Sequence, residues 1–469
     1  MARLDARCKA RIPVIIMVKG HDGNLESVTS NLGLGGAFIN SSLSLPENTQ
    51  VKLRAPLPTG ELEVDGTVLR QEQNGVAVKF LEVGQEEKSA LWEYIKENIG
   101  QTVCPFCGAA LKDQSARCND CGMETHLSKE QNSEAAISGN VAEIIRHLDS
   151  EINAVNAKLM LIENDLRLFG QADTEVLHEK TYNAINDFYD FARKMESALS
   201  DNKDLLRKKQ AEFRNKTDIF FSKSYFMNHA RTWPKGYPGD YKLLEAIYRN
   251  IPLSEGVGYL LDSYFLSTTL ANAVRTRLSW IKDMLKRELK GRQGLRVLNI
   301  ASGSTRELFE LAVEIKESDA TFTCVDLDSD AINFVLSRLS YTDIAFQIAM
   351  RKYNALRMAS HERNIKEFGL QDNIYSIGLF DYLTDDVLVR LLKELYLTLN
   401  PGGKLIASFK DCKRYETYDY HWLVDWSAFY QRTEAESRKL IDQAGIPENC
   451  VQTERDLSGV IIFYTLVRP

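Results

Sequence analysis

The stretch RVLNIASGS, residues 296–304, reads as a buried strand that runs into a turn of small residues. A helix is expected directly after it, from Glu307 to Ile315. Small residues let the backbone approach a ligand closely where such a strand ends, so the turn is a candidate binding site. A second expected strand ends in the carboxylate of Asp326, about 25 residues after the turn. This separation is typical of an acidic group that binds ribose hydroxyls, so the pair predicts a nucleoside-bearing cofactor.

The turn belongs to a region, residues 216–469, in which short apolar runs alternate with helical stretches. This alternation predicts an α/β domain with a doubly wound, Rossmann-like parallel sheet. The expected strands are 296–301, 322–326, 344–348, 373–379 and 403–409.

The rest of the chain predicts a multidomain protein. Residues 1–99 carry Val-rich runs separated by Gly, Asn and Pro, which predicts a small β-barrel or sandwich, and we expect a barrel closed by a helix over 86–99. Residues 128–215 carry apolar residues at heptad spacing, which predicts a helical spacer. Two antiparallel helices, or parallel helices in a homodimer, would both satisfy this pattern. The expected barrel strands are 13–18, 26–30, 51–55, 61–69 and 75–80.

Between barrel and spacer, residues 100–127 hold two CxxC pairs. Each pair places two thiolates on one tight turn, and the two pairs together make a closed tetrahedral site. A redox role for a single CxxC is the alternative, but redox motifs come singly. The sequence therefore predicts a zinc ribbon in which structural zinc supports folding. Its ligands are Cys104, Cys107, Cys118 and Cys121.

Overall composition is ordinary for a globular chain of 469 residues, with a formal charge of −7. No run of about 18 apolar residues occurs and no signal-peptide core is present, so we expect a cytoplasmic protein without a transmembrane segment. Net acidity argues against a nucleic acid polymer as partner. The −7 conceals a local +3 over residues 1–11, where three arginines and one lysine meet a single aspartate.

The stretch RCKAR, residues 7–11, stands before the first strand, and NLGLGGAFI, residues 31–39, follows it. With the later run GVAVKF these resemble the PilZ family of cyclic di-GMP receptors over residues 1–99. The resemblance implies that cyclic di-GMP is bound by an RxxxR loop and a [D/N]xSxxG turn. Gly33 stands where the family usually has Ser. The implied ligand residues are Arg7, Arg11, Asn31, Gly33 and Gly36.

The later runs VLNIASGS, CVDLDSDAI, NIYSIGLFDYL and LNPGGKLIASF resemble the motifs of class I S-adenosylmethionine-dependent methyltransferases. The family usually has Asp or Glu where Asn299 stands and Gly where Ala301 stands. The resemblance implies an enzyme with S-adenosylmethionine as cofactor. Its implied contacts are Ala301, Ser302, Gly303, Asp326, Asn354, Phe380 and Asp381.

Two further segments, WPKGYPGDY at 233–241 and DYHWLVDW at 419–426, resemble the bacterial methyltransferases that make 3-hydroxy fatty acid methyl ester signals. This likeness implies that Tyr237 and Asp240 contact the cofactor. A carboxylate acceptor is already deprotonated at neutral pH, so catalysis would need alignment and desolvation without a general base. If the acceptor were a hydroxyl or amine, the candidate bases would be His229, Asp381 and His421.

The sequence thus favours a methyltransferase that acts on a small molecule, with a fatty-acid carboxylate as one acceptor class, regulated by cyclic di-GMP. A noncatalytic, cyclic di-GMP-responsive adaptor with a degenerate methyltransferase fold is the alternative. Methylation of nucleic acid is disfavoured, because the [D/N]PP[Y/F] tetrapeptide of amino-directed DNA methyltransferases is absent.

Overall fold

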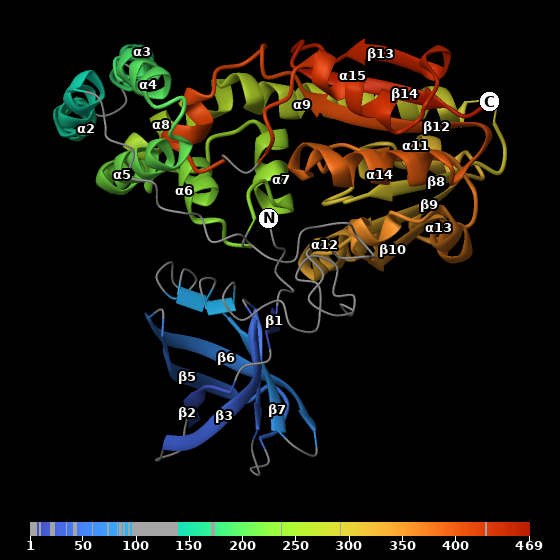
Figure 1. Cartoon of the computed structure of the whole chain (residues 1–469), viewed down its shortest axis with the longest axis horizontal. Coiled ribbons are helices and arrows are strands. Elements are labelled where there is room, and N and C mark those ends of the chain that lie inside the picture. The colour runs from blue at the N-terminus through green and yellow to red at the C-terminus, as the bar shows by residue number, and fades with distance from the viewer. Residues whose placement is uncertain are drawn as a thin grey trace. The chain divides into compact units, whose positions relative to one another are not determined.

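Figure 1 shows the computed structural model of the chain. It describes residues 7–8, 11–18, 24–33, 35–40, 45–58, 60–72, 75–81, parts of 83–95, 139–169, 174–235, 237–290, 292–426 and 429–469. The chain divides into two compact units. The first is Met1–Gln131 with Lys235–Tyr237, and the second is Asn132–Pro234 with Pro238–Pro469.

The first unit contains a closed six-stranded barrel. Strands follow one another in the order β3-β2-β5-β6-β7-β4, and β4 pairs back with β3, so the sheet has no open edge. The short strand β1 pairs with β3. Side chains alternate between the core and the surface, as they do in any strand with one buried face. The strands are β1 Arg7–Cys8, β2 Pro13–Val18, β3 Asn24–Gly33, β4 Gly36–Asn40, β5 Gln50–Leu57, β6 Gly60–Glu72 and β7 Gly75–Phe80.

The predicted barrel is confirmed, but one of its strands was not predicted and three are longer than predicted. Strands β2 and β7 have the predicted bounds, whereas β3, β5 and β6 extend beyond theirs. Strand β4 was not predicted, because its sequence follows a glycine-rich stretch that is typical of a loop. The predicted helix over 86–99 is described only in part, but Leu91 and Ile95 are helical and fully buried in the barrel core.

The second unit begins with four helices where a helical hairpin or coiled coil was predicted. The predicted second helix is divided into three, and the last of these is capped by Asn202, whose side chain accepts the N–H of Leu205. The four helices are α2 Gly139–Phe169, α3 Thr174–Asn186, α4 Tyr189–Ala198 and α5 Lys203–Phe221.

The heptad seam of α2 is already covered inside the chain. Its side chains Leu148, Ile152 and Leu159 are buried in the same hydrophobic cluster as the helices and sheet that follow. The pattern therefore needs no second copy to explain it, and a homodimer through this seam stays a prediction. Spacer and α/β region share one core and form one unit.

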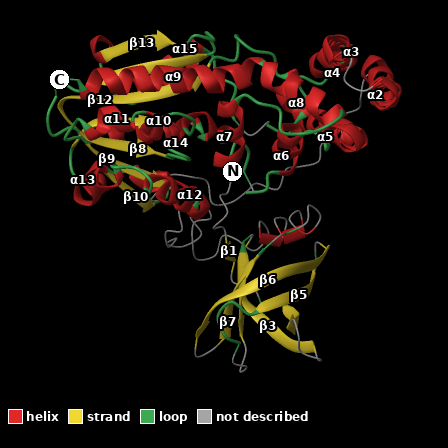
Figure 2. Cartoon of the chain, turned by 180° about the vertical axis from the view of Figure 1, so that it is seen from behind, coloured by secondary structure: helices red, strands yellow, loops and turns green. Residues whose placement is uncertain are grey.

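A seven-stranded sheet forms the centre of the second unit, in the order β10-β9-β8-β11-β12-β14-β13. The first five strands are parallel, and β14 is antiparallel to both β12 and β13. Helix α14 (Asp385–Tyr396) lies in front of the sheet in Figure 1, and α9 (Thr269–Leu289) lies in front of it in the reverse view of Figure 2. The strands are β8 Arg296–Ile300, β9 Thr321–Asp326, β10 Ile348–Lys352, β11 Gln371–Ser376, β12 Leu399–Lys410, β13 Val451–Arg455 and β14 Ile461–Val467.

The remaining helices of this unit flank and cap the sheet. The longer ones are α6 Tyr225–Thr232, α7 Tyr241–Arg249, α8 Val257–Ser267, α10 Arg306–Glu310, α11 Ala312–Lys316, α12 Ser329–Leu339, α13 His361–Phe368 and α15 Glu434–Gln443. The short turns of helix are η1 Ala345–Gln347, η2 Ala355–Met358, η3 Phe380–Tyr382, η4 Asp419–Leu423 and η5 Glu448–Cys450.

The doubly wound α/β prediction is confirmed, but one strand was misplaced. Residues 345–347 form a short helix, and β10 begins at Ile348, where the predicted strand ended. The side chain of Gln347 donates to three backbone carbonyls, including those of Ile315 and Ala320, which fixes a turn at this place. Strands β13 and β14 were not predicted, and the helix expected over 307–315 is broken at Leu311.

Candidate functional site

The candidate site lies where the strand order of the second unit reverses. Strand β8 lies between β9, the next strand in the chain, and β11, which comes after β9 and β10 in the chain. Ligands of open α/β sheets bind outside the carboxyl ends of the strands at such a switch point. The segments that leave the strands here are 301–305 after β8, 326–328 after β9 and 377–381 after β11.

The turn after β8 has an alternating left-handed backbone. Ala301, Gly303 and Thr305 have φ angles of +53°, +55° and +47°. A glycine adopts this conformation without strain, whereas alanine and threonine adopt it at a cost of about 1–2 kcal/mol each. Sequence reasoning found the turn but could not show that two residues with side chains would keep this backbone.

Replacing Ala301 by glycine is therefore expected to leave the melting temperature of the second unit unchanged or to raise it. The relief of left-handed strain offsets the roughly 0.5–1 kcal/mol of chain entropy that glycine costs. The control is Ala273→Gly in the interior of α9, where the same change removes a buried methyl group and a good helix former. Calorimetry of both variants checks this, and an equal loss of stability in the two would contradict a left-handed Ala301.

Asp326 pins the turn to the end of β9. Its Oδ2 accepts the N–H of Gly303 at 2.8 Å, and its Oδ1 accepts the N–H of Asp328 at 2.9 Å. The N–H of Ser302 donates to Val325 O at 3.1 Å. The Oγ of Ser302 is buried and has no hydrogen-bond partner among the described residues. A carboxylate and an unpaired hydroxyl thus lie side by side at the edge of the sheet, a donor set that fits the polar groups of a nucleoside cofactor.

Asn354 and Phe380, both predicted cofactor contacts, have structural partners in this arrangement. Asn354 follows β10, and its Oδ1 accepts the N–H of Leu356 at 3.0 Å, which begins η2. The ring of Phe380 is fully buried and its centroid lies 6.0 Å from that of Phe409. Phe380 is therefore a core residue next to the site.

Asp381 forms a buried ion pair with Lys410, the last residue of β12. The two charged groups are 2.5 Å apart, and the side chain of each is less than a tenth exposed. The same carboxylate accepts the backbone N–H of Lys410 at 3.2 Å. Burial lowers the pKa of Lys410, and the negative charge of Asp381 opposes this shift. Before Asp381 could act as a base, this ion pair would have to break.

His229 and Asp240 lie together, as two of the predicted site residues. The Nε2 of His229 is 2.6 Å from Oδ2 of Asp240, and Oδ1 of Asp240 accepts the N–H groups of Lys242 and Leu243. The pair thus fixes the start of α7. Tyr237 groups with the first unit. Its contact with the cofactor therefore stays a prediction.

Helix α7 is in turn attached to the candidate turn. Glu245 on α7 accepts hydrogen bonds from Arg306, directly after the turn, at 3.0 Å and from Arg338 on α12 at 2.7 Å. The segment that enters α7 at Asp240 is therefore held beside the carboxyl edge of the sheet.

His421, the third candidate base, lies in η4 with its ring largely buried. Burial, reinforced by the positive charge of Arg214, lowers the pKa of His421 to about 4. Its Nε2 has no hydrogen-bond partner among the described residues. The ring is therefore neutral at pH 7, and the nearby Trp422 and Trp426 are buried core residues.

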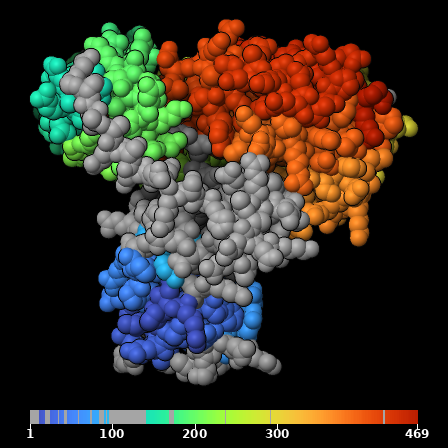
Figure 3. Space-filling view, viewed as in Figure 1, coloured from blue at the N-terminus to red at the C-terminus, as the bar shows by residue number. Residues whose placement is uncertain are grey.

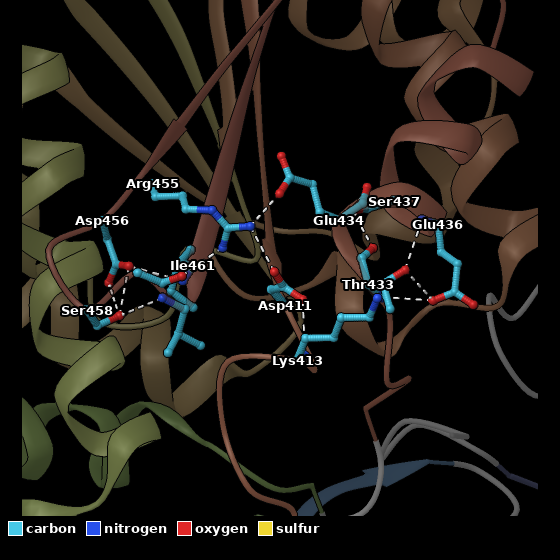
Figure 4. A network of polar contacts seen from close by, with 12 residues as sticks. Asp411, Lys413, Thr433, Glu434, Glu436, Ser437, Arg455, Asp456, Ser458 and Ile461 are labelled. Atoms are coloured by element: carbon cyan, nitrogen blue, oxygen red, sulfur yellow. Dashed lines mark hydrogen bonds and ion pairs between the residues drawn. The ribbon is translucent and has the colours of Figure 1, made fainter.

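The aromatic segment 411–433 is tied together at its two ends, as Figure 4 shows. Arg455 donates to Asp411 at 2.8 Å and to Glu434 at 2.5 Å, so one guanidinium joins the end of β12 to the start of α15. Thr433 and Glu436 form a reciprocal capping box at the same helix start. No sequence motif marks the bonds of Arg455, because Asp411 and Glu434 are far from it in the chain.

A buried acid beneath the turn was not predicted. Oε1 of Glu307 accepts Nδ2 of Asn299 at 2.9 Å and the hydroxyl of Tyr375 at 2.8 Å. Burial raises the pKa of Glu307 to about 7. In the sequence comparison, Asn299 stands where class I methyltransferases usually have Asp or Glu. Glu307 places a carboxyl group next to Asn299.

Glu307 should make the protein less stable as pH rises. Above its ordinary value of 4.5 the unfolded chain releases the proton, while the folded chain holds it up to about pH 7. The stabilising contribution is complete below pH 4.5 and is lost as pH rises through 7, about 3 kcal/mol in all. In urea unfolding, Glu307→Gln is expected to lose less stability between pH 5 and pH 8 than the wild type. The control Glu310→Gln, on the same helix, should keep the wild-type pH dependence, and a shared dependence in all three would contradict the assignment.

In the first unit, strand pairing brings several predicted ligand residues together. Arg7 of β1 lies opposite Gly33 of β3, and Gly33 lies opposite Gly36 of β4. The Oδ1 of Asn31 accepts the N–H of Phe38 at 3.1 Å, which closes the turn between β3 and β4. A side chain at Gly36 would lie 2.4 Å from a backbone oxygen of β7, so only glycine fits. Arg11 is exposed ahead of β2.

This barrel and its glycine turn agree with the comparison to known families, in which residues 2–97 match the PilZ domain family. Residues 2–97 form a PilZ domain. No curated protein sequence matches the chain significantly.

Solved structures similar to the chain include a possible exported protein from Bordetella parapertussis, with 17% identity over 71% of this chain and 100% of that one, at a TM-score of 0.42. Magnesium protoporphyrin IX methyltransferase from Synechocystis PCC 6803 is 14% identical over 43% and 85% of the two chains, at a TM-score of 0.32. The PilZ domain of CeSA from a cellulose-synthesising bacterium is 21% identical over 19% and 93%, at a TM-score of 0.17.

The predicted zinc ribbon at 100–127 lies outside the described residues, so its four cysteines remain predicted ligands. Among the residues with described positions, no cluster of His, Cys, Asp and Glu could hold a metal ion. Within the same residues, no helix has both the length and the apolar character that crossing a membrane requires.

Proposed function

We propose that the second unit is an S-adenosylmethionine-dependent methyltransferase that acts on a small molecule, and that cyclic di-GMP bound to the PilZ domain regulates it. The observation that carries the proposal is the switch point between β9, β8 and β11, where a left-handed turn and the carboxylate of Asp326 meet. The four runs that resemble class I methyltransferase motifs fall on β8, β9, β11 and β12, which are central strands of this sheet.

In this proposal each part of the site has a separate task. Asp326 accepts hydrogen bonds from the ribose hydroxyls, and Ser302 offers its unpaired hydroxyl to the polar end of the cofactor. The backbone of Ala301–Gly303 forms the floor of the site. When bound, S-adenosylmethionine supplies an electrophilic methyl group.

The state of two of the three candidate bases favours an acceptor that needs none. Asp381 is engaged with Lys410, and burial lowers the pKa of His421 to about 4, which makes it a weak base. His229, held by Asp240, remains the candidate base for a hydroxyl or amine acceptor. A carboxylate acceptor carries no proton to remove at neutral pH, so alignment and exclusion of water suffice. A fatty-acid carboxylate is the acceptor class that this arrangement and the sequence resemblance favour together.

Incubating the purified full chain with methyl-labelled S-adenosylmethionine and a cell extract tests the proposal. We expect a labelled small molecule to form and its rate of formation to change when cyclic di-GMP is added. Cofactor binding without transfer to any component of the extract would instead favour the noncatalytic adaptor, for which the non-glycine residues Ala301 and Thr305 in the turn are the supporting observation.

Cyclic di-GMP binding itself should depend on Arg11. A guanidinium binds phosphate and guanine edges through paired, charge-assisted hydrogen bonds, so Arg11→Ala is expected to weaken binding by about tenfold or more. Titration calorimetry of the full chain measures this. Arg70→Ala, which removes an exposed arginine from β6, is the control and should bind as the wild type does. Equal affinities in the two variants would show that Arg11 does not contact the ligand.

A further inference from the structure

A buried arginine lies at the carboxyl edge of β11. Arg277 is on α9, and only 6% of its surface is exposed. Its guanidinium is next to Gly378, which follows β11, and a side chain at that position would lie 3.5 Å from Nη1. The glycine therefore leaves space directly beside a cation at the switch point of the sheet.

Among the described residues, no acidic side chain forms an ion pair with this cation. The Nε of Arg277 has no hydrogen-bond partner there. Its guanidinium bonds to the hydroxyl of Tyr248, and its other neighbours are the hydroxyl of Tyr382 and the ammonium of Lys410, which is itself positive. Asp381, which interacts with both Tyr382 and Lys410, is held by Lys410 at 2.5 Å.

A buried charge without an oppositely charged partner is costly, and a bound anion would remove this cost. The flat, forked guanidinium fits a planar anion with two oxygens better than it fits a single point charge. Arg277 is thus buried, keeps its Nε–H without an acceptor and has the guanidinium geometry that binds a carboxylate.

We propose that Arg277 is the residue that binds and orients the carboxylate of the methyl acceptor, whose product is then a methyl ester. This inference rests on the proposed methyltransferase function. The transfer forms a bond between a carboxylate oxygen and the methyl carbon and breaks the bond between that carbon and sulfur. The electron pair stays on sulfur as a neutral thioether, and no proton moves.

The amino-acid end of the cofactor also carries a carboxylate, which shares the same chemistry. The arrangement of the strands favours the acceptor. Asp326 on β9 marks the nucleoside side of the turn, whereas Arg277 lies beside β11 on the other side of β8. Affinity for the cofactor product distinguishes the two sources, because only an acceptor carboxylate would leave that affinity unchanged.

The test compares wild type, Arg277→Gln and Arg277→Lys, with Arg287→Gln as a control at an exposed arginine on the same helix. Each full-length protein is incubated with methyl-labelled S-adenosylmethionine and cell extract, and methyl ester is counted as volatile label released by mild alkali. S-adenosylhomocysteine affinity is measured by calorimetry in parallel. We expect most of the label that the wild type transfers to be alkali-labile. Ester formation should fall about tenfold or more in Arg277→Gln and less in Arg277→Lys. The affinity of each variant for S-adenosylhomocysteine should stay within about twofold of the wild-type value.

Any one of three results would overturn this inference without overturning the proposed methyltransferase function. They are alkali-stable label in the wild type, unchanged ester formation in Arg277→Gln, and a loss of S-adenosylhomocysteine affinity that accounts for the lost activity. If Arg277→Gln does not fold, Arg277→Lys decides, and unchanged ester formation in that variant overturns the inference. A wild-type chain that binds no S-adenosylhomocysteine would overturn the proposed function, and this inference with it.

Discussion

Replacing Lys410 by methionine is expected to lower the free energy of unfolding of the second unit by about 3–5 kcal/mol. The change leaves the carboxylate of Asp381 buried without its partner, 2.5 Å away in the intact pair. Removing one member of a buried pair costs more than removing both, because the remaining charge stays desolvated. The double variant Asp381→Leu with Lys410→Met is therefore expected to recover most of the loss. Urea unfolding followed by tryptophan fluorescence measures both.

An exposed pair provides the matched control. Lys316 and Asp343 also form an ion pair, but both side chains are more than half exposed. Lys316→Met should leave the urea midpoint unchanged, because water replaces the lost partner. A single Lys410→Met variant as stable as the wild type would show that Asp381 is not buried as the structure describes it.

Replacing Asp326 by alanine is expected to weaken S-adenosylhomocysteine binding by about a hundredfold or more. Two charge-assisted hydrogen bonds to the ribose are lost, each worth roughly 1.5–3 kcal/mol. The turn also loses its attachment to β9, since Gly303 N–H no longer has its acceptor at 2.8 Å. Titration calorimetry of the full chain gives the affinity.

Asp372 offers a control of the same kind at the opposite end of the sheet. Its carboxylate accepts the N–H of Arg296 at 2.8 Å and Nδ2 of Asn400 at 2.9 Å, near the amino ends of β8 and β12. Asp372→Ala removes a strand-bridging carboxylate without touching the carboxyl edge, so it should bind the ligand as the wild type does. If Asp326→Ala also kept wild-type affinity, the nucleoside would have to bind elsewhere.

The central strands could be predicted because burial on both faces leaves a simple pattern. Strands β8 and β9 are short, largely buried runs that end in a turn and in Asp326, and both lie within one residue of their predicted bounds. Strand β10 begins at Ile348, where the predicted strand ended. The sequence does not show this shift, because the bonds of Gln347 to three carbonyls form only in the folded chain.

The residues that shape the site chemically were harder to predict. Arg277 and Arg275 stand two positions apart on one amphipathic helix, and nothing local distinguishes them. What makes Arg277 special is its contact with Gly378, about a hundred positions later in the chain. The same holds for Lys410, whose partner Asp381 comes from a different strand end. Pairings of this kind depend on strand order, which a single sequence does not specify.

The heptad pattern of α2 is real, but the sequence alone allows more than one partner for its apolar face. Its spacing correctly indicated a long helix with one apolar face. The same face packs on helices of its own chain, since Leu148 and Ile152 lie in the core that the sheet shares. Periodicity reports that a face is buried, and it does not report what covers it.

If the carboxyl edge of β8 and β9 binds S-adenosylmethionine, a crystal structure of the full chain grown with saturating S-adenosylhomocysteine will show it. We expect ligand density along Ala301–Gly303, with the ribose hydroxyls within hydrogen-bond distance of Asp326. An ordered but empty edge, or density for the ligand at any other place on the chain, would contradict this expectation.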